Sequence, residues 1–149
     1  KRAPMYWSKA GNAEGMCKGP ADMDDFRMKF DSLEEQQEDP DSIYNYVKQV
    51  IRVRNQNPVI ARGTTAYLEQ YSGEQCFALT RSYEGSNLLL LGNTSAEAVS
   101  VDLTGLTVGG TTAEELVLLG ELYTGEETAE RAGTVVTLPA YSILILGEE

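Results

Sequence analysis

The pattern of apolar and polar positions changes near residue 63. Before this point one segment, Ser42 to Asn57, carries apolar residues at the 3.6-residue spacing of an amphipathic helix. After it, β-prone segments alternate with glycine-containing turns every 8–12 residues or so, roughly the spacing of strands in a sandwich. The pattern therefore predicts a loop-and-helix segment, residues 1–62, followed by an all-β domain, residues 63–149.

The predicted helix has signals at both ends. Asp41 or Ser42 can cap its N-terminus, and Asn57-Pro58 stops it because proline cannot donate to the helical ladder. One apolar stripe runs along it, made of Ile43, Tyr46, Val47, Val50 and Ile51. Because such a stripe is normally covered, we expect it to dock on the β domain or to drive self-association of the chain.

The β domain is predicted to be an antiparallel sandwich or barrel. In one segment Val99, Val101 and Leu103 share a face, as in a half-buried strand. Leu88–Leu91 and Ile143–Leu146 are apolar on both faces, which is expected of central strands. The predicted strands are Ala66–Gln70, Cys76–Arg81, Asn87–Gly92, Ala98–Leu103, Leu116–Tyr123, Thr134–Leu138 and Tyr141–Leu146.

The opening segment carries large side chains without any regular period. It contains the single tryptophan, Trp7, and all four methionines. We expect a long loop that lies against a larger body. Asp22, Asp24 and Asp25 lack the ligand spacing of a calcium loop, so we expect no metal site there.

Composition removes several classes of function. The net charge of −11 disfavours binding to nucleic acid or to anionic lipid, and no apolar run is long enough to span a membrane. The chain has no histidine, which excludes a Ser–His–Asp or Cys–His site and a histidine-ligated metal. Its two cysteines form neither a disulfide framework nor a zinc site. The acidic run at residues 34–41 is interpreted as solvated surface near a helix N-terminus.

Three parts of the chain carry a resemblance to one enzyme family. Arg2-x-Pro4-Met5-x-Trp7 resembles a segment of the α-amylase family, glycoside hydrolase family 13, in the loop after the eighth barrel strand. Asp39–Tyr46 and Ile51–Pro58 resemble the last barrel helix of that family. The similarity continues through the family's C-terminal Greek-key sandwich at Leu88–Asn93, Ala98–Leu103, Leu138–Tyr141 and Ile143–Leu146.

The resemblance implies a mainly β chain: an antiparallel Greek-key sandwich preceded by a long loop and one α-helix from the end of a (β/α)8 barrel. The family cleaves α-glucosidic bonds with retention, using three carboxylates on barrel strands. Those strands lie upstream of the opening motif, so no catalytic residue is expected in this chain. The resemblance thus implies the C-terminal portion of a bacterial enzyme that hydrolyses or transfers sugars. Its partners would be its own barrel and an α-glucan substrate, and any calcium would lie in the missing part. Localisation stays open between the cytoplasm and the cell surface.

The resemblance also places Arg2 and Trp7 near the rim of the substrate cleft. They are expected either to shape an outer sugar subsite, by stacking and by hydrogen bonds to hydroxyls, or to pack the loop onto the barrel.

The rival function for the sandwich is a starch-binding module. Such modules present exposed aromatic rings, whereas this segment has no tryptophan and its tyrosines lie in or beside strands where burial is expected: Tyr67, Tyr71, Tyr83, Tyr123 and Tyr141. A structural role in covering the barrel is therefore favoured. Asn93-Thr94-Ser95 matches an N-glycosylation acceptor but is interpreted as a turn at a strand end.

Overall fold

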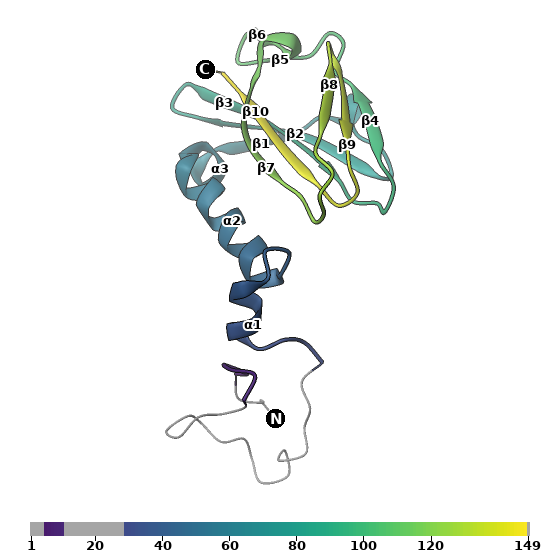
Figure 1. Ribbon diagram of the computed structural model, residues 1–149. Helices are drawn as coiled ribbons and strands as arrows, with labels where there is room; N and C mark the ends of the chain where they lie inside the picture. The colour runs from purple at the N-terminus through teal and green to yellow at the C-terminus, as the bar shows by residue number, and fades with distance from the viewer. Residues whose placement is uncertain (1–4, 11–28, 149) are drawn as a thin grey trace. The chain divides into compact units, whose positions relative to one another are not determined.

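The computed structural model describes residues 5–10 and 29–148 (Figure 1). Three helices come first, α1 (Leu33–Glu38), α2 (Ile43–Gln56) and α3 (Pro58–Arg62). The strands that follow are β1 (Thr64–Tyr67), β2 (Cys76–Tyr83), β3 (Ser86–Asn93), β4 (Val99–Asp102), β5 (Thr107–Val108), β6 (Thr111–Thr112), β7 (Val117–Leu122), β8 (Glu130–Ala132), β9 (Val135–Leu138) and β10 (Ile143–Gly147). Short 3-10 helices, η2 (Glu69–Tyr71) and η3 (Ala113–Glu115), interrupt them.

The contacts within the chain define two compact units, an N-terminal unit of residues 1–48 and a C-terminal unit of residues 49–149. This division falls inside α2. The boundary predicted at residue 63 concerns where a barrel would end in a larger enzyme, and it stays a prediction.

The C-terminal unit is an antiparallel sandwich, as predicted. One sheet has the strand order β1-β2-β3-β10-β7 and the other the order β4-β9-β8, while β5 and β6 form a small separate ribbon. The two main sheets enclose one core, to which Leu89 and Leu146 come from the larger sheet and Val101 and Leu138 from the smaller. Burial of these aliphatic side chains is the main stabilising term of the unit.

The two apolar segments predicted to be central strands are central. β3 lies between β2 and β10, and β10 lies between β3 and β7. Leu89 pairs with Leu146 in the register and points into the sandwich core. Leu88 and Ile145 are also buried but lie outside that core, because the second face of this sheet is covered as well.

The C-terminal half of α2 and the whole of α3 supply that cover. Val53 is buried, and a Cβ atom on Gly120 of β7 would lie 3.0 Å from Val53 Cγ1. The Gln49 side-chain amide donates to the carbonyl oxygen of Glu121 over 3.1 Å. Val59 of α3 is buried, and α3 contacts β2 and β3. The unit is therefore a three-layer arrangement of helix, sheet and sheet (Figure 1).

The helix predicted at residues 42–57 is confirmed as α2. Pro58 ends it, as expected, but it also opens α3, because a proline fits the first helical position, where no donor is needed. The prediction of one helix missed α1 and α3, and it missed β5, β6 and β8, which have only two or three residues each.

The end of β3 is fixed by a buried asparagine. Asn93 Nδ2 donates to the carbonyl oxygens of Glu97, Leu138 and Pro139 over 2.7, 3.2 and 2.9 Å. Its Oδ1 accepts from the backbone N–H and the hydroxyl of Ser95. The acceptor-like sequence at this position is thus a strand-end turn, and the amide is committed to holding the two sheets together.

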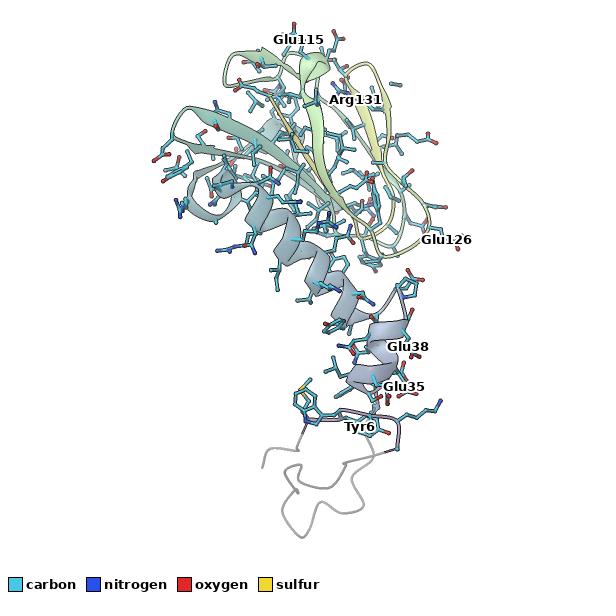
Figure 2. All side chains as sticks on the ribbon, turned by 60° about the vertical axis from the view of Figure 1, so that its left-hand side comes forward. Tyr6, Glu35, Glu38, Glu115, Glu126 and Arg131 are labelled. Atoms are coloured by element: carbon cyan, nitrogen blue, oxygen red, sulfur yellow. The ribbon has the colours of Figure 1, made fainter. Side chains whose placement is uncertain are left out.

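Charge is distributed very unevenly along the chain. Residues 63–149 contain 13 acidic residues and only two basic ones, Arg81 and Arg131, so this part alone accounts for the net charge of −11. Arg81 donates to the carbonyl of Val59 and to the hydroxyl of Thr65. Arg131, on β8, donates to the carbonyls of Gly133, Leu116 and Ala113 (Figure 2). Both guanidinium groups therefore serve the fold, and the acidic side chains define the electrostatic field of the sandwich surface.

Candidate functional site

The candidate site of the N-terminal unit is built on the short helix α1. Ser32 caps this helix in a capping box: the Glu35 N–H donates to Ser32 Oγ, while the Ser32 N–H and hydroxyl donate to Glu35 Oε2 over 3.1 and 2.7 Å. The hydroxyl and the backbone N–H of Ser32 lower the pKa of Glu35, so its carboxylate stays ionised at neutral pH.

The described part of the opening motif is attached to this helix. The backbone N–H groups of Leu33 and Glu34 donate to the carbonyl oxygens of Tyr6 and Trp7 over 2.9 and 3.0 Å. These are N–H groups that the first turn of a helix leaves without helical partners. Lys9 Nζ lies 3.4 Å from Glu35 Oε1, an exposed pair that adds little stability. The main chain of residues 6 and 7 is thus fixed by the helix terminus.

Trp7 keeps part of its indole ring accessible. The residue is 44% exposed, and Met5 and Phe30 in the same unit are exposed as well. Arg2, its predicted companion at a sugar subsite, lies outside the described residues, as do Asp22, Asp24 and Asp25. The structure thus gives a geometry for Trp7 alone: a fixed backbone that carries an accessible aromatic ring.

The next element, α2, corrects one prediction. Its predicted stripe splits into two faces, because Val53 and the partly buried Tyr46 and Val50 lie on one side of the helix. Three aliphatic side chains on the other side are uncovered: Ile43 is 74% exposed, Val47 46% and Ile51 52%. We call these three residues the outer face of α2. Within the C-terminal unit the face containing Val53 docks on the sandwich and Ile51 does not. Docking or self-association of Ile43 and Val47, which belong to the N-terminal unit, stays a prediction.

A second correction concerns the tyrosines of the sandwich. Burial was expected for all five, and three of them, Tyr71, Tyr83 and Tyr123, are partly buried. Tyr67 and Tyr141, however, are 57% and 51% exposed. The residue pattern offered no signal for this exposure, because Tyr67 is the last residue of β1 and Tyr141 lies in the turn before β10, where the pleat does not decide which side faces the core.

The described residues contain no group of three or more acidic or cysteine side chains that could hold a metal ion. The expectation of calcium in a missing part of a larger enzyme concerns residues beyond this chain and stays a prediction. Among the residues that the structure describes, no helix has the length and apolarity needed to cross a lipid bilayer.

Comparison with solved structures identifies the architecture. The chain is similar to Amy13B of Eubacterium rectale, at 37% sequence identity and a TM-score of 0.84, over 97% of this chain and 27% of that one. The chain belongs to the α-amylase family. It corresponds to the C-terminal portion of these enzymes, glycoside hydrolase family 13.

Two further structures share the fold. The α-amylase of H. orenii matches at 22% identity and a TM-score of 0.71, over 97% of this chain and 28% of that one. The trehalulose synthase MutB of Pseudomonas mesoacidophila MX-45 matches at 25% identity and a TM-score of 0.61, over 78% of this chain and 19% of that one. No protein-family model matches the chain.

The chain therefore spans about a quarter of the length of Amy13B and of the H. orenii α-amylase. Among the residues that the structure describes, the indole of Trp7 and the outer face of α2 are exposed apolar surfaces of the helical segment. Both come from the segment that the sequence assigned to the end of a barrel.

Proposed function

We propose that this chain is the non-catalytic C-terminal portion of a retaining, α-glucan-active enzyme, in which it supports the catalytic barrel. The observation that carries the proposal is the outer face of α2. Three aliphatic side chains in one row of the helix are exposed, while the adjacent face of its C-terminal half, which contains Val53, is docked on a sheet.

A helix with one face docked and an apolar face left open is expected to have a second partner, because exposed aliphatic surface gains free energy on leaving water. The solved structures that match this chain contain about three to four times its length of polypeptide. That remaining polypeptide, the barrel, is the proposed occupant. The sandwich then contacts the neighbouring face of α2 through Val53 and Gln49.

The substrate class rests on the named relatives. They include an α-amylase, a trehalulose synthase and an α-glucosyl transfer enzyme. These names support an α-glucan or α-glucoside as the substrate of the larger enzyme. Hydrolysis and sugar transfer remain equal alternatives within this class.

The reading frame upstream of the Lys1 codon provides the first test. The proposal predicts barrel strands that carry an Asp, a Glu and an Asp at their ends. A different kind of domain upstream would overturn it.

A variant pair tests the role of the outer face in the full-length protein. Val47→Glu places a charge on that face and should lower the melting temperature of the barrel, because a buried unpaired carboxylate is costly. Gln56→Glu adds the same charge at an exposed position on the side of the helix opposite Val47 and should leave it unchanged. Equal effects of the two substitutions would argue against the contact.

For Arg2 and Trp7 we propose a contact with sugar at an outer subsite. The accessible indole and its fixed backbone support the part played by Trp7. In the full-length enzyme, Trp7→Ala should change the preference among oligosaccharide lengths, and Trp7→Phe should restore part of it. Lost thermal stability with unchanged kinetics would instead indicate packing of the loop onto the barrel.

A further inference from the structure

The turn between β9 and β10 holds an exposed aromatic residue in a strained conformation. Tyr141 has φ = 48°, a left-handed value that few bulky residues adopt. Glu84 is the other described non-glycine residue with a positive φ, and it precedes Gly85 in the tight β2–β3 hairpin, where such values are required. Tyr141 has no such hairpin around it. A glycine or an asparagine would fit its backbone better, so its ring needs another explanation.

The surrounding hydrogen bonds fix the backbone that carries this ring. The Tyr141 N–H donates to the carbonyl oxygen of Ser95 over 3.1 Å. The buried Ser142 hydroxyl donates to the carbonyl oxygen of Pro139 over 2.7 Å. The Asn93 N–H donates to the carbonyl oxygen of Ser142, and the Asn93 side chain also holds Pro139. The ring is therefore mounted on a rigid support, which lowers the entropy cost of binding a ligand.

Three loops meet around Tyr141 at one end of the sandwich. The β3–β4 loop contacts it through Ser95, and the β7–β8 loop reaches the same turn, where the Thr124 hydroxyl donates to the carbonyl oxygen of Ala140. The exposed residues of these two loops are threonine, alanine, glycine and glutamate, at positions 94, 96–98 and 124–128. Hydroxyl and carboxylate groups beside an accessible ring are suited to a neutral polyhydroxylated ligand.

The charge of this region separates the candidate ligands. Neither loop contains a lysine or an arginine, and Glu97, Glu126 and Glu127 are exposed there. Phosphates and anionic lipids are therefore repelled. A sugar chain meets no such penalty: its C–H face can lie on the phenol ring, and its hydroxyls can donate to the carboxylates.

We propose that Tyr141 is the platform of a surface site for α-glucan chains, separate from the subsite proposed at Trp7. The choice of α-glucan rests on the proposed function, whereas the site itself rests on the exposure, strain and rigid support of Tyr141. A single ring buries little area, so the affinity for one short chain is weak, in the millimolar range, and a polymer with many repeats is held more firmly.

Affinity electrophoresis of the 149-residue chain tests the proposal, with amylopectin in one gel and hydroxyethylcellulose, a β-linked polymer, in the other. The chain should be retarded by amylopectin alone. Tyr141→Ala should abolish the retardation. Tyr141→Gly should do so as well while keeping or raising the melting temperature, because glycine relieves the strained φ. Tyr67→Ala removes a tyrosine of similar exposure from β1 and should leave the retardation intact.

Titration with maltoheptaose, followed by NMR of the labelled chain, gives a second readout. Amide shifts should concentrate at residues 94–97, 124–128 and 140–142, and the apparent dissociation constant should rise about tenfold or more in Tyr141→Gly. No retardation of the wild-type chain, equal retardation of Tyr141→Gly, or retardation that low salt strengthens and high salt removes would each overturn the proposal. The last result would indicate a charged contact. None of these results bears on the barrel, which the upstream reading frame tests separately.

Discussion

The ring of Phe77 lies over Gly92, its partner across the β2–β3 pair. A Cβ atom built on Gly92 would lie 2.1 Å from Phe77 Cε1 and 2.2 Å from Cζ, far inside the distance at which carbon atoms meet. Gly92 is buried. The missing side chain therefore makes the space that the aromatic ring fills, an arrangement by which a glycine in a strand interior is compensated.

Gly92→Ala should lower the free energy of unfolding by about 1–3 kcal/mol, because the ring has to leave its position. Urea denaturation followed by circular dichroism measures the loss. In a Phe77→Ala background the same substitution should cost much less, since the obstacle is gone. Equal costs in the two backgrounds would show that the ring is not what excludes a side chain at position 92.

Asn93→Asp should destabilise the sandwich by about 3 kcal/mol or more, because a carboxylate would face the carbonyl oxygens of Leu138 and Pro139. Thr94→Ala is the matched control in the same turn. The Thr94 hydroxyl donates to one exposed carbonyl, that of Gln75. Removing this hydrogen bond should lower the free energy of unfolding by no more than about 1 kcal/mol. Thermal unfolding of both variants gives the comparison. A melting temperature unchanged in Asn93→Asp would contradict the assigned role of the amide.

Acid should destabilise the chain through hydrogen-bonded carboxylates. The hydroxyl of Thr104, its backbone N–H and the hydroxyl of Thr134 lower the pKa of Asp102 below 3.8. Capping hydroxyls and backbone N–H groups lower the pKa of Glu35 and Glu115 below 4.5 in the same way.

Because these folded-state pKa values are depressed, the stability they contribute is present above the unfolded values and is lost as the pH falls through the folded ones. The free energy of unfolding should therefore be flat from neutral pH down to about pH 5 and then decrease. Urea titrations at a series of pH values test this, and Asp102→Asn should show a shallower decrease in the C-terminal unit. An unchanged slope would mean that Asp102 does not contribute.

The isolated chain should self-associate through the outer face of α2, since the barrel that would cover it is absent from this chain. Light scattering at increasing concentration should show a rising mean mass, and Val47→Glu or Ile51→Glu should restore the monomer. Gln56→Glu, on the opposite side of the same helix, changes its charge equally and should not. If the chain stays monomeric at all concentrations, the prediction that the outer face of α2 mediates self-association is wrong.

Periodicity predicted the position of α2 but not its docking. Ile43, Val47 and Ile51 form a stripe directly beside that of Tyr46, Val50 and Val53, so the apolar surface is wider than one contact needs. A pattern cannot tell which half meets the sandwich when a second partner is missing. The strands of the larger sheet were predicted because runs of aliphatic residues are bounded by glycines. β5, β6 and β8 are too short to leave such a run.

The candidate sites were predictable to different degrees. Trp7 was singled out from the motif that surrounds it, whereas the attachment of its carbonyl to the N–H of Glu34 depends on α1, which has only six residues and no apolar period. Tyr141 was expected to be buried. Its exposure follows from the passage of the chain between two sheets, which sets φ at this residue and which no local pattern records.

The uneven charge of the sandwich also determines where trypsin can cut it. Residues 63–149 contain no lysine, and their two arginines lie within β2 and β8, where strand pairing keeps the backbone out of a protease active site. The last basic residue before them is the exposed Arg62, at the end of α3. Digestion of the folded chain should therefore leave one resistant piece beginning at Gly63, which mass spectrometry would identify. The distribution of charge along the sandwich thus predicts a protease-resistant core that begins after the last basic residue of the helical segment.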